Sequence, residues 1–122
     1  MSTPPPGNLP ASPTIPLTPD VKAAYLDLNA KIEAAIEATT DVTALQALNA
    51  QQAQVDDVLQ KDAIFRLGAN TDAFNAVLKQ ISDTNKGLKT LQEQIEATAS
   101  HFATADKIVA AITKVLTLVP GL

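Results

Sequence analysis

The sequence predicts an all-α fold: a long antiparallel helical hairpin of coiled-coil type, preceded by a Pro-rich extended N-terminal tail. Three observations predict this fold. Apolar residues recur at alternating steps of four and three over residues 74–119, which is the period of a helical seam and not of a strand. A second stripe with the same period covers residues 21–63. Between the stripes, residues 68–72 read Gly-Ala-Asn-Thr-Asp, which is typical of a helix end, a turn and a new helix start capped by Asn70 or Thr71.

The tail comprises residues 1–18, and seven of the eight prolines of the chain lie in residues 1–19. Four prolines follow at every third position: Pro10, Pro13, Pro16 and Pro19. Polyproline II has three residues per turn, so these prolines line one edge of an extended rod. Three roles fit such a tail: a semi-rigid linker, a ligand for an SH3-like partner, or a segment that packs Leu9, Ile15 and Leu17 onto this protein or a neighbouring copy.

The first arm of the hairpin is predicted to span about residues 19–67. Thr18 suits the N-cap, Pro19 fits the first helical position, and Asp20 favours the positive end of the helix dipole. Residues 39–43 read Thr-Thr-Asp-Val-Thr, a β-branched cluster of lower helix propensity, and Asp41 is able to cap a new helix there. Because the apolar stripe keeps its phase across this segment, we expect one long helix.

The turn is predicted at residues 68–70 and the second arm over about residues 71–119, ended by Pro120 and Gly121. Folding the chain at this turn places apolar residues opposite one another along nearly the whole length. The expected pairs include Leu59 with Leu78, Val42 with Ile95, Leu28 with Val109, and Tyr25 with Ile112. Gln52 falls opposite Asn85, and a buried amide pair in a helical seam fixes its register.

Two alternatives to the hairpin remain open. A three-helix arrangement breaks the first arm near Asp41, and a four-helix arrangement breaks the second arm as well, near Ser100.

The second arm also carries a further apolar stripe beside the first, formed by Ile108, Ala111, Val115 and Leu118. Apolar surface of this width needs another layer to cover it. That layer is the tail, another copy or a different protein. The predicted contact residues are Ile108, Val115 and Leu118, with Leu9, Ile15 and Leu17 of the tail.

No residue cluster predicts catalysis, a cofactor site or a metal site. The chain has no cysteine and a single histidine, His101, which lacks a Glu-x-x-His partner. It also has no glycine-rich phosphate loop and no nucleophile elbow. The net charge of −4 argues against nucleic acid as a partner. We therefore do not expect an enzyme.

Targeting signals do not fix the compartment. No signal peptide is expected, because no basic residue precedes Lys22 and the N-terminus has no apolar h-region. No apolar run approaches the roughly 18 residues that suggest a membrane span. A cytoplasmic location and secretion by a signal-independent route both fit.

The function that the sequence favours is that of a non-enzymatic structural or interaction protein, which self-associates or docks into a larger assembly through helical faces and the Pro-rich tail. The alternative is a membrane-active helical protein, such as a pore-forming toxin component. This alternative comes from the Ala/Val/Ile/Leu-rich residues 102–122. A small inhibitor or immunity-type binding protein is a further alternative.

Overall fold

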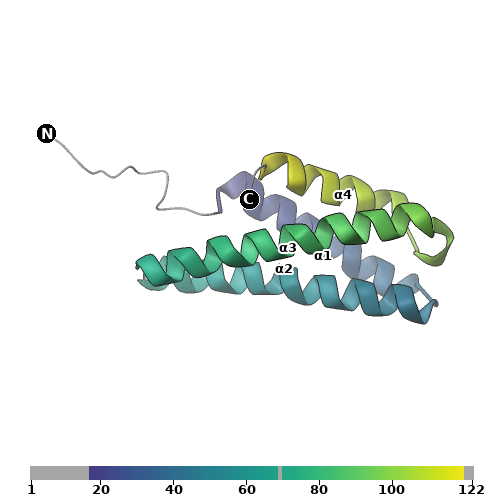
Figure 1. Cartoon of the computed structure of the whole chain (residues 1–122), viewed down its shortest axis with the longest axis horizontal. Helices are drawn as coiled ribbons and strands as arrows, with labels where there is room; N and C mark the ends of the chain where they lie inside the picture. Colours follow the sequence, from purple (N-terminus) through teal and green to yellow (C-terminus); the bar gives the residue numbers. More distant parts are fainter. Residues whose placement is uncertain (1–16, 69, 120–122) are drawn as a thin grey trace, which may run out of the picture.

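The computed structural model describes residues 17–68 and 70–119, and this part of the chain is helical. Its elements in chain order are α1 (Pro19–Ala38), α2 (Val42–Gly68), α3 (Thr71–Ala97), the 3-10 turn η3 (Ala99–His101) and α4 (Ala105–Leu118). The α-helices run alternately in opposite directions and form an antiparallel four-helix bundle (Figure 1). The all-α prediction is therefore confirmed. Residues 1–16, most of the predicted tail, lie outside the described residues.

The helices pair as in the predicted hairpin, but neither arm is one continuous helix. The most extensive contacts join α2 to α3 and α1 to α4, as folding at residues 68–70 requires. In addition, α1 packs against α2 and α3 packs against α4, because each arm is broken and folds back on itself. The expectation of two unbroken arms was wrong, and the four-helix alternative, broken near Asp41 and Ser100, describes the chain.

The first break has a local cause. Thr39 is extended, with φ −83° and ψ 135°, which ends α1. The Asp41 carboxylate Oδ1 then accepts a hydrogen bond from the Ala44 backbone N–H at 2.8 Å and so caps α2. The β-branched cluster and a capping aspartate together outweigh the apolar phase that favoured one continuous helix.

The second break spans residues 98–104. Thr104 closes it in the left-handed conformation, with φ 51°, immediately before α4. The two breaks are tied together at the same end of the bundle, because the Ala103 backbone N–H donates to the Thr39 hydroxyl at 3.0 Å.

Two helix starts follow their predicted caps. The Thr18 hydroxyl accepts from the Val21 N–H at 3.3 Å, with Pro19 directly after it. The Asn70 side chain accepts from the Ala73 N–H at 2.8 Å at the start of α3. Each side chain satisfies a backbone N–H that has no partner within its helix.

The core lies along the axis of the bundle. Its largest fully buried side chains are Tyr25, Leu17, Leu28, Ile32, Leu48, Ile81, Leu88, Ile95, Ile108, Ile112, Val55 and Val58. On α2 the buried face differs from the predicted stripe: Ala44 and Gln51 are buried, whereas Val42 is 67% exposed. The break at residues 39–41 changes the rotation of α2 about its own axis. The apolar period extrapolated from α1 therefore does not predict which face of α2 is buried.

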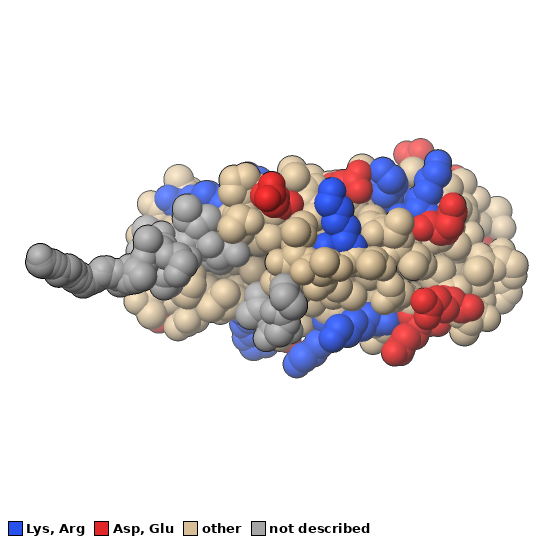
Figure 2. All heavy atoms as spheres, turned by 90° about the horizontal axis from the view of Figure 1, so that it is seen from above, with Lys and Arg blue, Asp and Glu red and all other residues tan. Residues whose placement is uncertain are grey.

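The helices differ in length, and this shapes the molecule. α2 and α3 each have 27 residues, whereas α1 has 20 and α4 has 14. The end of the α2–α3 hairpin therefore projects beyond the ends of α1 and α4 (Figure 1). Seen from above, basic and acidic side chains are interspersed along the bundle, with uncharged surface between them (Figure 2).

Candidate functional site

The predicted interface residues of α4 do not form a free surface. Ile108 and Val115 are fully buried, because α4 turns this stripe toward α1 within the same chain. Leu17 is buried as well, and Leu118 is partly exposed, at 38%. Leu9 and Ile15 lie outside the described residues. The expectation that this stripe awaits another layer is corrected: the chain covers it with its own first helix.

The predicted register pair is not formed. The Gln52 amide donates to the Glu33 carboxylate on α1, in an exposed contact. Asn85 is buried and accepts a hydrogen bond from the Tyr25 hydroxyl instead. The buried amide of α2 is the neighbouring residue, Gln51, which donates to the Thr84 backbone oxygen at 3.3 Å. Amides do lie inside the bundle: Gln51 joins α2 to α3 as the predicted pair would, whereas Asn85 joins α3 to α1.

The pair of Tyr25 and Asn85 is the buried polar contact between α1 and α3. Tyr25 is fully buried, and its hydroxyl lies 2.7 Å from the Asn85 Oδ1. Burial raises the pKa of Tyr25 well above its ordinary value, because the phenolate is poorly solvated there. Within residues 17–68 and 70–119, the Asn85 Nδ2 has no hydrogen-bond partner. Among the described residues, the Tyr25 hydroxyl is therefore the hydrogen-bond partner of the Asn85 side chain.

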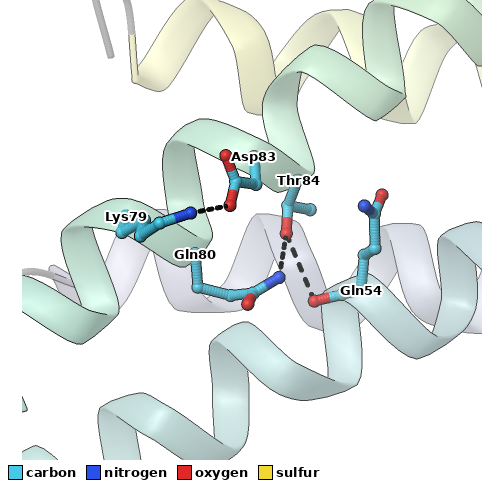
Figure 3. A network of polar contacts seen from close by, with 5 residues as sticks. All are labelled: Gln54, Lys79, Gln80, Asp83 and Thr84. Atoms are coloured by element: carbon cyan, nitrogen blue, oxygen red, sulfur yellow. Dashed lines mark hydrogen bonds and ion pairs between the residues drawn. The ribbon is translucent and has the colours of Figure 1, made fainter.

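A polar seam joins α2 to α3 (Figure 3). The Gln80 amide donates to the Thr84 hydroxyl at 3.0 Å, and that hydroxyl donates to the Gln54 backbone oxygen at 3.3 Å. Lys79 and Asp83 form an ion pair of 2.8 Å at the surface of α3, and Lys79 lowers the pKa of the Asp83 carboxyl. The Thr84 hydroxyl of the seam ties α3 to the backbone of α2.

The broken end of the bundle contains a small polar cavity. A space of about 280 Å³ lies between α2 and the connection from α3 to α4, and Asp41, Gln94, Thr98 and His101 are among its lining residues. The His101 Nδ1 is 3.7 Å from the Asp41 Oδ2, and both side chains are partly solvated. Asp41 already uses its other oxygen to cap α2. This pair links the two connections, and Thr43 and Thr98 line the same cavity.

An apolar groove lies on the outer surface between α3 and α4, and we call it the α3–α4 groove. It has a volume of about 390 Å³, and its apolar lining residues are Ile95, Ala99, Ala105, Val109 and Ala110. Small alanine side chains leave the groove open. Glu96 on α3 and Asp106 on α4 complete its lining. The Gln92 amide donates to the Thr113 hydroxyl at 3.0 Å and bridges the two helices further along.

The projecting end of the α2–α3 hairpin carries the most exposed apolar side chain. Leu67 is 90% exposed and Ile64 is 53% exposed, and we call these two residues the tip pair. They are three residues apart and so are neighbours on one face of α2. Beneath them, the rings of Phe65 and Phe74 pack with centroids 5.6 Å apart and join the two helices.

The start of α1 is anchored close to this tip. The Arg66 guanidinium donates to the Asp62 carboxylate and to the Leu17 backbone oxygen, each at 2.7 Å. Asp62 is 1% exposed, so this ion pair neutralises a buried charge. Leu17, where the described chain begins, therefore lies beside the end of α2.

No protein family, curated protein or solved structure matches this chain. In the described ranges, no helix combines the length and the apolar content that a membrane crossing requires. The same residues contain no group of three or more side chains placed to hold a metal ion. Function is therefore argued from surface features alone.

Of these features, sequence reasoning missed the tip pair and the α3–α4 groove. The signal for the tip pair was present: Ile64 and Leu67 fall outside the predicted stripe, just before the turn. The groove had no comparable signal, because it depends on where the second break directs α4.

Proposed function

We propose that this chain is a non-enzymatic interaction protein that self-associates through the projecting end of its α2–α3 hairpin. The observation that carries the proposal is the tip pair: two large aliphatic side chains, Ile64 and Leu67, exposed together at the end of the molecule. Fully burying an aliphatic side chain of this size is worth about 1.5–3 kcal/mol, so a contact at the tip has a clear driving force.

The position of Leu17 supports the same end as the contact region. The Arg66 guanidinium holds the Leu17 backbone oxygen beside the end of α2, and residues 1–16 directly precede Leu17 in the sequence. Those residues include Leu9 and Ile15, the apolar tail residues that the sequence favours for contact with a neighbouring copy. Tip and tail are proposed to act together in one assembly.

The test is the mass in solution, measured by size exclusion with light scattering over a range of protein concentrations. The test variant carries Ile64→Gln with Leu67→Gln, which removes the apolar side chains without adding charge. Glutamine is a good helix former, so the helix content should remain intact. The matched control is Val42→Gln, which replaces another exposed apolar residue at the opposite end of the same helix.

We expect the unchanged protein and the Val42→Gln control to form oligomers, and the double glutamine variant to be a monomer. A chain that stays monomeric at every concentration would refute the proposal. A third variant that lacks residues 1–16 tests the tail, and Leu17 must be kept because it is buried in the bundle. Weaker association of this variant would support a role for the tail.

A further inference from the structure

The α3–α4 groove has room for the aliphatic side chains of a partner. A cavity of about 150 Å³ is large enough for a benzene molecule, so the groove, at about 390 Å³, accommodates two aliphatic side chains. Ile95 is buried at its base, and Ala99 and Ala110 are exposed at its edges. A projecting apolar side chain is the shape that complements it.

The tip pair is such a projection. Leu67 and Ile64 stand one helical turn apart on the end of the hairpin that extends beyond the rest of the bundle (Figure 1). Two neighbouring aliphatic side chains match the size of the groove, so the most exposed apolar group of this chain and its open apolar groove are complementary in volume.

Charge favours the same pairing. The carboxylates beside the groove are Glu96 and Asp106, and no ion pair to either is present among residues 17–68 and 70–119. On α4, Lys107 and Lys114 do not line the groove, but each is about one turn from Ala110 at its edge. The charged residues that line the groove itself, Glu96 and Asp106, are both acidic.

The end of α2 presents the opposite sign. Lys61 and Arg66 lie within one turn of the tip pair, and the carboxylate between them, Asp62, is buried and already paired with Arg66. Asp57 lies nearly three turns before Leu67 and one turn before Lys61, and Asp72 lies in the first turn of α3. Lys61 is thus the cation of this end that is placed to meet Glu96 or Asp106.

We infer that the α3–α4 groove receives the tip pair of a second copy of this chain. The inference rests on the proposed self-association and specifies its geometry. The groove is near the connection from α3 to α4, whereas the tip is at the other end of the bundle, so the contact joins different surfaces of the two copies. Such a head-to-tail contact builds rings or open chains and not closed two-fold dimers.

The experiment mixes two variants that are defective at different surfaces. The tip variant carries Ile64→Gln with Leu67→Gln and keeps its groove. The groove variant carries Ala110→Lys, which places a long cationic side chain in the groove and repels Lys61. Glu96→Lys, a surface change near the favourable C-terminal end of α3, is a second groove variant in case Ala110→Lys disturbs α4. The control is Ala34→Lys, the same change at an exposed position on the outer face of α1.

We expect each variant alone to associate at least about 10-fold more weakly than the unchanged protein, as removal of an interface anchor does. An equimolar mixture should form dimers that do not grow further, because one intact tip meets one intact groove. The Ala34→Lys control should assemble normally. Light scattering measures all of these masses.

The outcomes separate the two proposals. Full assembly of both groove variants, with loss of assembly in the tip variant, would overturn the groove inference and leave tip-mediated association standing. A mixture that stays monomeric while the unchanged protein oligomerises would also overturn the groove inference. An unchanged protein that is itself monomeric would refute the proposed function, and the groove inference with it.

Discussion

Replacing Tyr25 with phenylalanine should destabilise the bundle through Asn85. Phenylalanine keeps the buried ring and removes the hydroxyl that donates to the Asn85 Oδ1 at 2.7 Å. The Asn85 Nδ2 already has no partner in the described residues, so the substitution leaves the whole side-chain amide unsatisfied at 3% exposure. An orphaned buried polar group costs about 1–3 kcal/mol.

The assay is thermal or denaturant unfolding followed by helical circular dichroism. In a domain of this size 1 kcal/mol corresponds to roughly 4 °C, so Tyr25→Phe should lower the Tm by roughly 4–12 °C. Asn85→Leu should also destabilise, since it orphans the tyrosine hydroxyl. The double variant Tyr25→Phe/Asn85→Leu removes both polar groups, and it should be close to the unchanged protein or more stable.

Gln52→Leu provides the control, because the Gln52 amide makes an exposed contact with Glu33. Its effect should stay within about 0.5 kcal/mol of zero. The reasoning would be refuted if Tyr25→Phe also changed the free energy of unfolding by less than about 0.5 kcal/mol, or if the double variant were less stable than both single variants.

Two further predictions concern pH and capping. Tyr25 is the only tyrosine, and burial raises its pKa above the ordinary 10.0. The unfolded chain therefore loses this proton first, and stability should fall as pH rises above about 10, by up to about 1.4 kcal/mol per pH unit from this group. Unfolding measured at pH 9 to 11 should show a steeper loss for the unchanged protein than for Tyr25→Phe, and equal slopes would contradict the assignment. Asp41→Ala removes the cap of α2 and should cost about 1 kcal/mol, whereas Asp41→Ser keeps an acceptor and should cost less. Equal melting temperatures for Asp41→Ala and the unchanged protein would show that the cap contributes nothing.

Local chemistry predicted the helix termini well. Thr18 and Asn70 cap as expected, because an N-cap depends on a few neighbouring residues. Asp41 was also recognised as a cap, but the continuous apolar phase was given more weight. The continuous apolar phase was a poor guide because a helix in a four-helix bundle packs against two neighbours and has a wide apolar face. Such a face fits both a period continuous with α1 and one shifted by the break.

Tertiary contacts were harder to predict. The stripe placed Gln52 inside and the structure buries Gln51, one residue earlier, because the break at residues 39–41 rotates α2. Similarly, Ile108 and Val115 were correctly read as an apolar face, but whether their cover comes from this chain depends on the path of α4. The tip pair could be recognised in the sequence as two aliphatic residues outside the stripe. The groove could not be predicted without the positions of α3 and α4 in space.

The order in which the helices follow one another bears on how the chain folds. Consecutive helices pack on each other, and only residues 69 and 70 separate α2 from α3. The packing of α1 on α4 is the extensive contact with the largest sequence separation, and the entropy of loop closure grows with that separation. We therefore expect the α2–α3 pair to form early and the meeting of α1 with α4 to come late, on a landscape of low contact order that favours rapid folding. Folding φ-values at Leu88, a buried residue of α3, should then exceed those at Ile112 on α4.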